Sequence, residues 1–182
     1  MNNWQFKKNP HAPLHLLANQ QLYFVTGRTL YGKPYLRLDS TKKAFLSILK
    51  DFLSRKKWEL DHWEIMHNHY HFTAISALGE DLPLIMGNIH RKSAKEIRQK
   101  TTLKVSKKVW HNYWDRCIRD ENEYYNCLKY MYWNPVKHGY TTQPADYRWS
   151  SFHGLLENGV DVEGWSFLGD RVDRLPFLPG DF

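Results

Sequence analysis

Three histidines stand at alternate positions in the segment Met66–Phe72, which reads MHNHYHF. If this segment is an extended strand, His67, His69 and His71 all point to one side of the sheet, because side chains alternate along a strand. Imidazoles about 7 Å apart on one strand face can converge on a single divalent cation. The alternative is a polar strand face with solvated rings. Two imidazoles alone make a weak metal site, so a further ligand is needed from elsewhere.

A second group with chemical potential lies in the segment KYMYWNPVKHG. Tyr130 and Asn134 are four residues apart at the end of a predicted helix, so they share one face of it. Asn134 offers a neutral oxygen ligand, and Tyr130 offers a phenol hydroxyl. A phenol becomes a useful nucleophile when a metal polarises the phosphate that it attacks. The alternative is an aromatic-rich amphipathic helix without chemistry, and the neighbouring histidine strand favours the first interpretation.

Basic residues are concentrated between positions 91 and 108, where the acid Glu96 is outnumbered by lysines and arginines. The range Leu82–Thr101 reads as a helix, and Arg91, Lys95 and Arg98 share a face of it through spacings of four and three. Such a row can follow a sugar–phosphate backbone, whereas the alternative is a solvated outer face. The 8 tryptophans and 11 tyrosines include rings on which unpaired bases could stack, although most are expected in the core.

The charge of the chain is unevenly distributed. The 182 residues include 26 bases and 19 acids, which gives a formal net charge of +7. Residues 153–182 hold six of the acids and two of the bases, so residues 1–152 carry a large positive excess. An excess of this size attracts polyanions such as nucleic acids. We therefore divide the chain into a domain of residues 1–152 and an acidic C-terminal tail of residues 153–182.

The composition excludes several classes of protein. A hydrophobic fraction of 42% and an aromatic fraction of 15% exclude a disordered or collagen-like chain. The apolar runs are short, so no membrane span is expected. Cys117 and Cys127 are too few for a disulfide framework, and the N-terminus lacks the apolar stretch of a secretory signal. The expectation is a cytoplasmic protein without an organic cofactor.

The hydrophobic periodicity predicts an α+β fold. Strands are predicted at Leu22–Arg28, Trp58–Met66, His69–Ser76 and Val109–Ile118, and helices at Ser40–Lys56, Leu82–Thr101 and Glu121–Trp133. Residues 1–20 read as an irregular arm. Ser40 and Asp120 are the expected caps of the first and last helices, and Asn134-Pro135 should end the last. This order predicts a ferredoxin-like split β-α-β antiparallel sheet with helices on one face, plus an additional C-terminal helix that carries Tyr130.

Both motifs resemble those of a known family. His69-Tyr70-His71 resembles the HUH motif (His, bulky hydrophobic, His) of single-tyrosine transposases. YMYWNPVKHG resembles the tyrosine-helix motif of their REP-associated branch, the RAYT proteins of bacteria. Further matches are YFVTGR at Tyr23–Arg28, CIRDENEY at Cys117–Tyr124 and YRWSSF at Tyr147–Phe152. The resemblance covers Leu22 to Phe152, and it departs from the family at His67, where Pro is usual, and at Tyr70, where an aliphatic residue is usual.

The resemblance implies a single-stranded DNA endonuclease in which His69 and His71 bind Mg²⁺ or Mn²⁺ and Tyr130 is the nucleophile. Asn134 takes the place of the third, amide-bearing ligand, which is Gln in related transposases. The implied partner is single-stranded or hairpin DNA of the REP type. The resemblance also implies a nucleoid-associated protein of the bacterial cytoplasm. A monomer is favoured over a homodimer, and the role of His67 stays open.

The function that we expect is cleavage and rejoining of hairpin DNA by a metal-dependent transesterification through a 5′-phosphotyrosine intermediate. Arg91, Lys95 and Arg98 are the expected contacts to the DNA backbone. Two alternatives stay open: a metal-dependent nuclease that uses water, and a non-catalytic nucleic-acid-binding module. A covalent protein–DNA adduct would exclude the nuclease, and metal-dependent cleavage would exclude the binding module.

Overall fold

The computed structural model describes residues 18–101, 104–105, 107–157, 162 and 165. Most of the N-terminal arm and most of the acidic tail lie outside these residues. The strands are β1 (Leu22–Thr29), β2 (Glu59–Ile65), β3 (His69–Ile75) and β4 (Trp110–Cys117). The helices are α1 (Asp39–Arg55), α2 (Leu82–Lys100), α3 (Glu121–Lys137) and α4 (Phe152–Glu157), with short 3₁₀ turns at Leu30–Gly32, Gly79–Asp81 and Pro144–Asp146. Within the described residues, no helix is long and apolar enough to cross a membrane.

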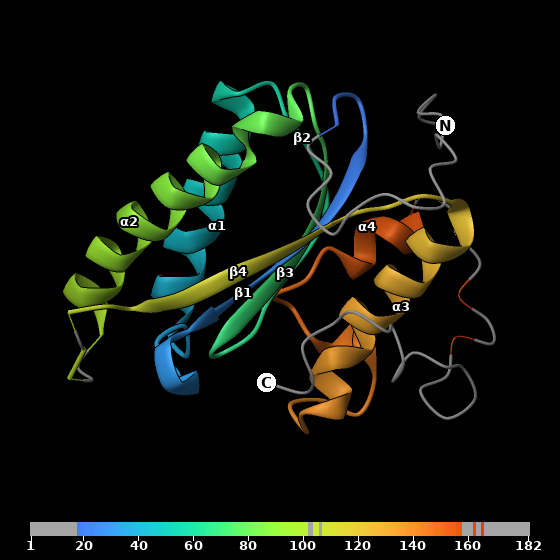
Figure 1. Ribbon diagram of the computed structural model, residues 1–182. Helices are drawn as coiled ribbons and strands as arrows, with labels where there is room; N and C mark the ends of the chain where they lie inside the picture. Colours follow the sequence, from blue (N-terminus) through green and yellow to red (C-terminus); the bar gives the residue numbers. More distant parts are fainter. Residues whose placement is uncertain (1–17, 102–103, 106, 158–161, 163–164, 166–182) are drawn as a thin grey trace.

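The sheet has the strand order β2-β3-β1-β4, and every neighbouring pair is antiparallel. Strand β3 lies between β1 and β2, which are joined through α1, and this is the split β-α-β arrangement. Helices α1 and α2 cover one face of the sheet, and α3 and α4 cover the other (Figure 1). The predicted ferredoxin-like fold with an additional tyrosine-bearing helix is therefore confirmed.

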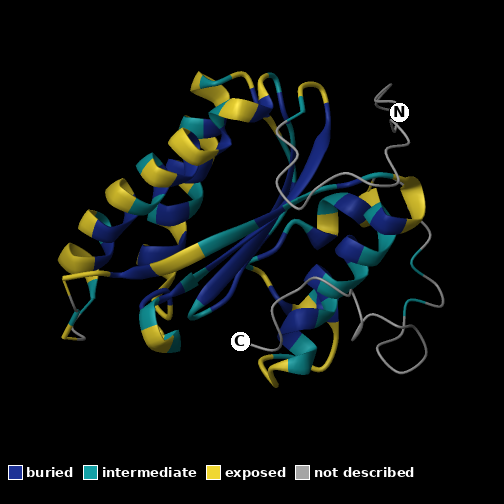
Figure 2. Cartoon of the chain, in the orientation of Figure 1, coloured by how far each residue is buried: buried dark blue, intermediate teal, exposed yellow. Residues whose placement is uncertain are grey.

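Each face of the sheet has its own hydrophobic core (Figure 2). The larger core packs α1 and α2 against side chains such as Val25 and Phe72, whereas the smaller core packs α3 and α4 against Leu22 and Phe24. Neighbouring residues of one strand thus belong to different cores, as alternation along a buried strand requires. The sheet is consequently the central layer of the fold, with a layer of helices packed on each face.

Gly27 of β1 has no room for a side chain, because a Cβ there would lie 2.2 Å from the hydroxyl oxygen of Tyr70. That hydroxyl cannot move freely, since it lies 2.7 Å from Nε2 of the half-buried His90, whose ring stacks on Trp110. Gly87 in α2 is the opposite case, because nothing lies within 4 Å of a Cβ at that position.

We therefore expect two Gly-to-Ala substitutions to have opposite effects on stability. Gly27→Ala should lower the free energy of unfolding by about 2–3 kcal/mol, as overpacking of a core does. Gly87→Ala should raise it by about 0.5–1 kcal/mol, because alanine loses less backbone entropy in a helix. Urea denaturation of the two variants measures both changes, and similar shifts of the same sign would show that the Tyr70 contact does not constrain β1.

Two helix ends differ from the sequence prediction. Helix α1 begins at Asp39 after Leu38, and Ser40 makes no capping bond because it lies within the helix. Helix α3 begins as predicted, with the Asp120 carboxylate accepting the Glu123 backbone N–H, but it continues through Pro135 to Lys137. A proline within a helix lacks the N–H of the ladder and crowds the carbonyl four residues earlier, and the burial of Pro135 offsets part of this cost. Asn134 is consequently held on a helix rather than after it.

Candidate active site

Two imidazoles and one amide meet between β3 and α3. His69 and His71 point from β3 toward α3, while the Tyr70 ring between them points into the core beneath α1 and α2. The amide nitrogen of Asn134 lies 2.6 Å from Nε2 of His71 and 3.3 Å from Nε2 of His69. All three side chains are buried. The structure thus brings Asn134 into contact with two histidines that precede it by 65 and 63 positions in the sequence.

The second nitrogen of each imidazole is also held. Nδ1 of His69 lies 2.7 Å from the Asn68 side-chain oxygen, which can only accept, so Nδ1 carries the proton. Nδ1 of His71 lies 2.7 Å from the Thr26 hydroxyl. Both Nε2 atoms accept from the Asn134 amide and therefore present their lone pairs to the same point. Partners of this kind fix the ring orientation of metal-binding histidines.

Both rings are neutral at physiological pH. Burial, and to a smaller extent the nearby His138, lowers the pKa of His71 to about 3. Burial also holds the pKa of His69 well below its ordinary value, and His71, His138 and Arg28 act in the same direction. A histidine must lose its proton before it can bind a metal. Two buried imidazoles that stay unprotonated are therefore suited to hold a cation.

The Tyr130 ring lies beside this group. It meets the His71 ring nearly perpendicularly at a centroid distance of 5.4 Å, and it also makes an edge contact with Phe24 at 6.5 Å. The Lys137 amine lies 5.8 Å from the centre of the same ring. Tyr130 and Asn134 are one turn apart on α3, so the phenol and the amide face β3 together. Tyr130 is partly exposed, which leaves it open to a substrate.

His138 is a neighbour that the sequence interpretation missed. It follows Asn134 by a further four residues, at the C-terminal cap of α3, and its exposed ring lies 5.3 Å from that of His69. The repeated spacing of Tyr130, Asn134 and His138 was the available signal. The predicted end of the helix at Trp133 concealed it, because the spacing has meaning only if the helix continues.

The donors fit a divalent cation. The Asn134 side-chain oxygen is buried without a hydrogen-bond partner, and turning the amide about its Cβ–Cγ bond would bring that oxygen toward both Nε2 atoms. The described residues contain no group of three His, Cys, Asp or Glu side chains that could hold a metal ion. A cation at this place would accordingly have two nitrogens and one amide oxygen from the protein, and would leave coordination positions for water or phosphate.

The remaining predicted residues lie elsewhere. His67 belongs to the turn between β2 and β3 rather than to the strand, and its ring packs against Tyr140 at 4.3 Å. Arg91, Lys95 and Arg98 are exposed on α2, which covers the face of the sheet opposite to α3. Their contact with DNA stays a prediction.

Other cations are close to the histidines. Arg28 lowers the pKa of His69, and Arg37 and Lys42 lower that of His67 after the larger effect of burial. The sequence offered no means to single out these residues among the other bases of the chain. They come together because the loop after β1 and the start of α1 meet the turn that precedes β3.

Comparison with known proteins assigns the chain to a family. The sequence pattern of the family described as Transposase IS200 like matches residues 19–132. This range spans more than half of the chain and includes both histidines and Tyr130. The chain belongs to this family of transposases and is an enzyme of that class.

Particular relatives point to one branch of the family. A REP-associated tyrosine transposase of Escherichia coli is 26% identical over 168 residues, which cover 86% of this chain and 94% of the relative. A Haemophilus influenzae protein assigned to the same group is 28% identical over 165 residues, which cover 82% of this chain and 93% of that protein. The solved structure of a REP-associated tyrosine transposase bound to a REP hairpin superposes with a TM-score of 0.68 at 21% identity, over 88% of this chain and 92% of the other. These likenesses confirm the resemblance to REP-associated tyrosine transposases and the fold.

Proposed function

We propose that this protein is a metal-dependent single-stranded DNA endonuclease and transposase, which cleaves and rejoins REP-type hairpin DNA through a 5′-phosphotyrosine intermediate. The observation that carries the proposal is the position of the Tyr130 ring, which is 5.4 Å from the His71 ring and on the same face of α3 as Asn134. A nucleophile and three metal donors on facing elements are the parts that a metal-assisted phosphoryl transfer needs.

In the proposed step, the Tyr130 oxygen attacks the scissile phosphorus. The bond from phosphorus to the Tyr130 oxygen forms, the bond from phosphorus to the 3′ oxygen breaks, and the phenol proton passes to water while the 3′ oxygen takes one up. Mg²⁺ or Mn²⁺, when bound, supplies Lewis-acid polarisation of the phosphate. His69, His71 and Asn134 would hold that ion. Because the phosphotyrosine retains the energy of the ester, a second 3′ hydroxyl can reverse the step and join strands without ATP.

Thr26 and Asn68 have supporting roles in this proposal. Each contacts the Nδ1 atom of one imidazole, at 2.7 Å in both cases, and so leaves the Nε2 lone pair directed at the metal position. The Lys137 amine near the Tyr130 ring adds positive charge where a phenolate would develop, which favours the charged form of the nucleophile.

A REP-type hairpin is proposed as the partner because the relatives named above are REP-associated transposases and one of them was solved with such a hairpin. We also propose that the protein acts as a monomer in the bacterial cytoplasm. The outer edge of β2, where a second sheet could pair, is occupied at its C-terminal half by residues 149–151 of the same chain. The backbone N–H of Ile65 donates to the Trp149 carbonyl oxygen, and that of Ser151 donates to the Trp63 carbonyl oxygen, at 2.9 Å each. An occupied edge is protected against pairing with another chain.

The test of this function is the cation dependence of a covalent adduct. Purified protein incubated with a REP-type hairpin and Mn²⁺ should give a protein-linked DNA band on a denaturing gel, and EDTA should prevent it. A cut strand without linked protein would instead support a nuclease that uses water. The absence of cleavage with Mg²⁺, Mn²⁺ and several hairpins that bind would contradict a catalytic role.

A further inference from the structure

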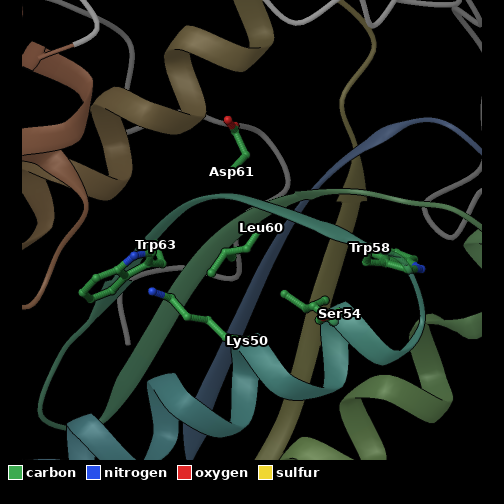
Figure 3. Close-up of a pocket in the computed structure, with 7 residues that line it drawn as sticks. Lys50, Ser54, Trp58, Leu60, Asp61 and Trp63 are labelled. Carbon is green, nitrogen blue, oxygen red and sulfur yellow. The ribbon is translucent and has the colours of Figure 1, made fainter.

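A groove runs along the outer edge of the sheet, between α1 and β2. It consists of two hollows, of about 380 Å³ and 410 Å³, which share Trp63 of β2 in their lining. Trp58 and Lys50 also line the first hollow, and Lys43 and Trp149 line the second. In Figure 3, Lys50 extends from α1 toward the Trp63 ring, with Leu60 and Ser54 between the helix and the strand. We call this feature the β2 groove.

The spacing of residues on α1 explains why the groove is hollow and basic. Lys43 and Lys50 are seven residues apart, so they lie on the same side of the helix two turns apart, and both are exposed. Ser40 and Ser54 occupy the same side and are too small to fill the space in front of the indole rings. Helix α1 thus contributes two positive charges to the groove and leaves the space in front of the indole rings open.

The acids in the groove are already engaged. Asp39 accepts from the indole N–H of Trp149 at 2.6 Å and forms an ion pair with Arg148. Asp61 accepts from the hydroxyls of Tyr124 and Thr73, at 2.9 Å each, and in Figure 3 it points away from Lys50 toward α3. Asp39 is thus paired with a cation, and the Asp61 carboxylate is turned toward the hydroxyls that it accepts from, so Lys43 and Lys50 present positive charge at the open side of the groove. Indole faces with lysines between them are typical of surfaces that bind unpaired nucleic acid.

A series of ring contacts leads from the candidate active site toward the groove and ends at Tyr147. Tyr147, two residues before Trp149, stacks on Tyr140 at a centroid distance of 6.1 Å. Tyr140 in turn lies 6.4 Å from His138, which lies 5.3 Å from His69. His138 and Tyr140 are exposed, whereas Tyr147 is buried. A strand that leaves His69 on this side would therefore meet two exposed rings before it reaches the segment that carries Trp149.

We propose that the β2 groove binds the single-stranded DNA that flanks the hairpin. Its bases stack on Trp63 and Trp149, and its phosphates contact Lys43 and Lys50. This inference rests on the proposed function, because it takes the DNA processed at His69 and His71 as the strand that enters the groove. It assigns to α1 and β2 a part in substrate selection: hairpins with unpaired flanks bind better than blunt ones.

The test compares a blunt REP-type hairpin with the same hairpin carrying an oligothymidylate extension on its 5′ or its 3′ side. Fluorescence anisotropy should show tighter binding of one extended hairpin to the wild-type protein. Trp63→Leu should lose about tenfold of affinity for that DNA and none for the blunt hairpin, whereas Trp63→Phe should retain the affinity, because a phenyl ring still stacks.

Lys50→Ala keeps the test independent of the fold, because Lys50 is exposed. It should reduce the salt dependence of binding to the extended hairpin by about one counterion, whereas Lys92→Ala on the exposed side of α2 should leave the difference between extended and blunt hairpins unchanged. Equal affinity of the wild-type protein for blunt and extended DNA, or equal losses on both, would overturn the proposal. A preference for the extension without any covalent adduct would retain the groove and contradict the proposed function.

Discussion

Replacement of Tyr130 with Phe is expected to abolish covalent capture of DNA and to lower the rate of strand cleavage by at least about a thousandfold, as loss of a nucleophile does. The substitution removes one oxygen and retains the ring, so the contacts with His71 and Phe24 persist. The affinity for the hairpin should therefore change by less than about twofold, because the lost hydroxyl acts in the reaction and not in binding.

Single-turnover cleavage under saturating Mn²⁺ measures this effect, and anisotropy measures the binding. Tyr125→Phe is the matched control. Tyr125 also lies on α3 and is partly buried, but its ring contacts Tyr124 and Trp165 rather than the histidines. It should cleave at the wild-type rate. Adduct formation by Tyr130→Phe at a comparable rate would mean that another group is the nucleophile.

Replacement of His71 with Ala is expected to weaken the binding of Mn²⁺ by a hundredfold or more and to reduce cleavage accordingly. His71 has the shorter of the two contacts to Asn134, and its loss would leave one imidazole and one amide, which do not hold a divalent ion in competition with water. Thr26→Val should have a smaller effect, of about tenfold, because it removes only the partner that orients the His71 ring.

Isothermal titration with Mn²⁺ in the absence of DNA separates binding from catalysis. His90→Phe is the control for removal of an imidazole, because His90 is half-buried with a pKa that burial lowers to about 3, but its ring contacts Tyr70 and Trp110 on the opposite face of the sheet. It should bind Mn²⁺ as the wild-type protein does, provided that it melts as a folded protein. An unchanged affinity for Mn²⁺ in folded His71→Ala would place the metal elsewhere.

The local parts of the site are predictable from the sequence because short-range geometry determines them. Alternation puts His69 and His71 on one strand face, and a spacing of four puts Tyr130 and Asn134 on one helix face. These two rules need no knowledge of the rest of the fold. The order of elements adds the ferredoxin-like sheet, since a split β-α-β unit can be arranged in few ways.

Other features depend on tertiary packing and were therefore out of reach. His67 lies in the turn between β2 and β3, as the predicted strand bounds imply, but the contact of its ring with Tyr140 depends on how the segment after α3 meets that turn. Pro135 is tolerated in α3 because it is buried near the helix end, and this extension brings His138 to His69. The row of Arg91, Lys95 and Arg98 is a correct helix face, but its spacing does not reveal that α2 covers the side of the sheet away from the histidines.

The α2 row and the cations near the histidines imply different DNA paths. Arg28 and Arg37 lie on the histidine side of the molecule and would meet the phosphates next to the scissile bond. The row on α2 could be reached only by DNA that passes around an edge of the sheet. The β2 groove provides such an edge, beside α1, which packs against α2.

The most direct test of the central claim is identification of the residue that becomes linked to DNA. Trypsin should release the peptide 130–137 from the adduct formed with Mn²⁺, and this peptide contains both Tyr130 and Tyr132. Fragment masses distinguish the two, and Tyr132 is buried with its hydroxyl bound to His62 and Ser151. We predict that the nucleotide is attached to Tyr130 and that EDTA eliminates the modified peptide. A nucleotide on any other residue, or cleavage that leaves every tyrosine unmodified at all times, would contradict the proposed site.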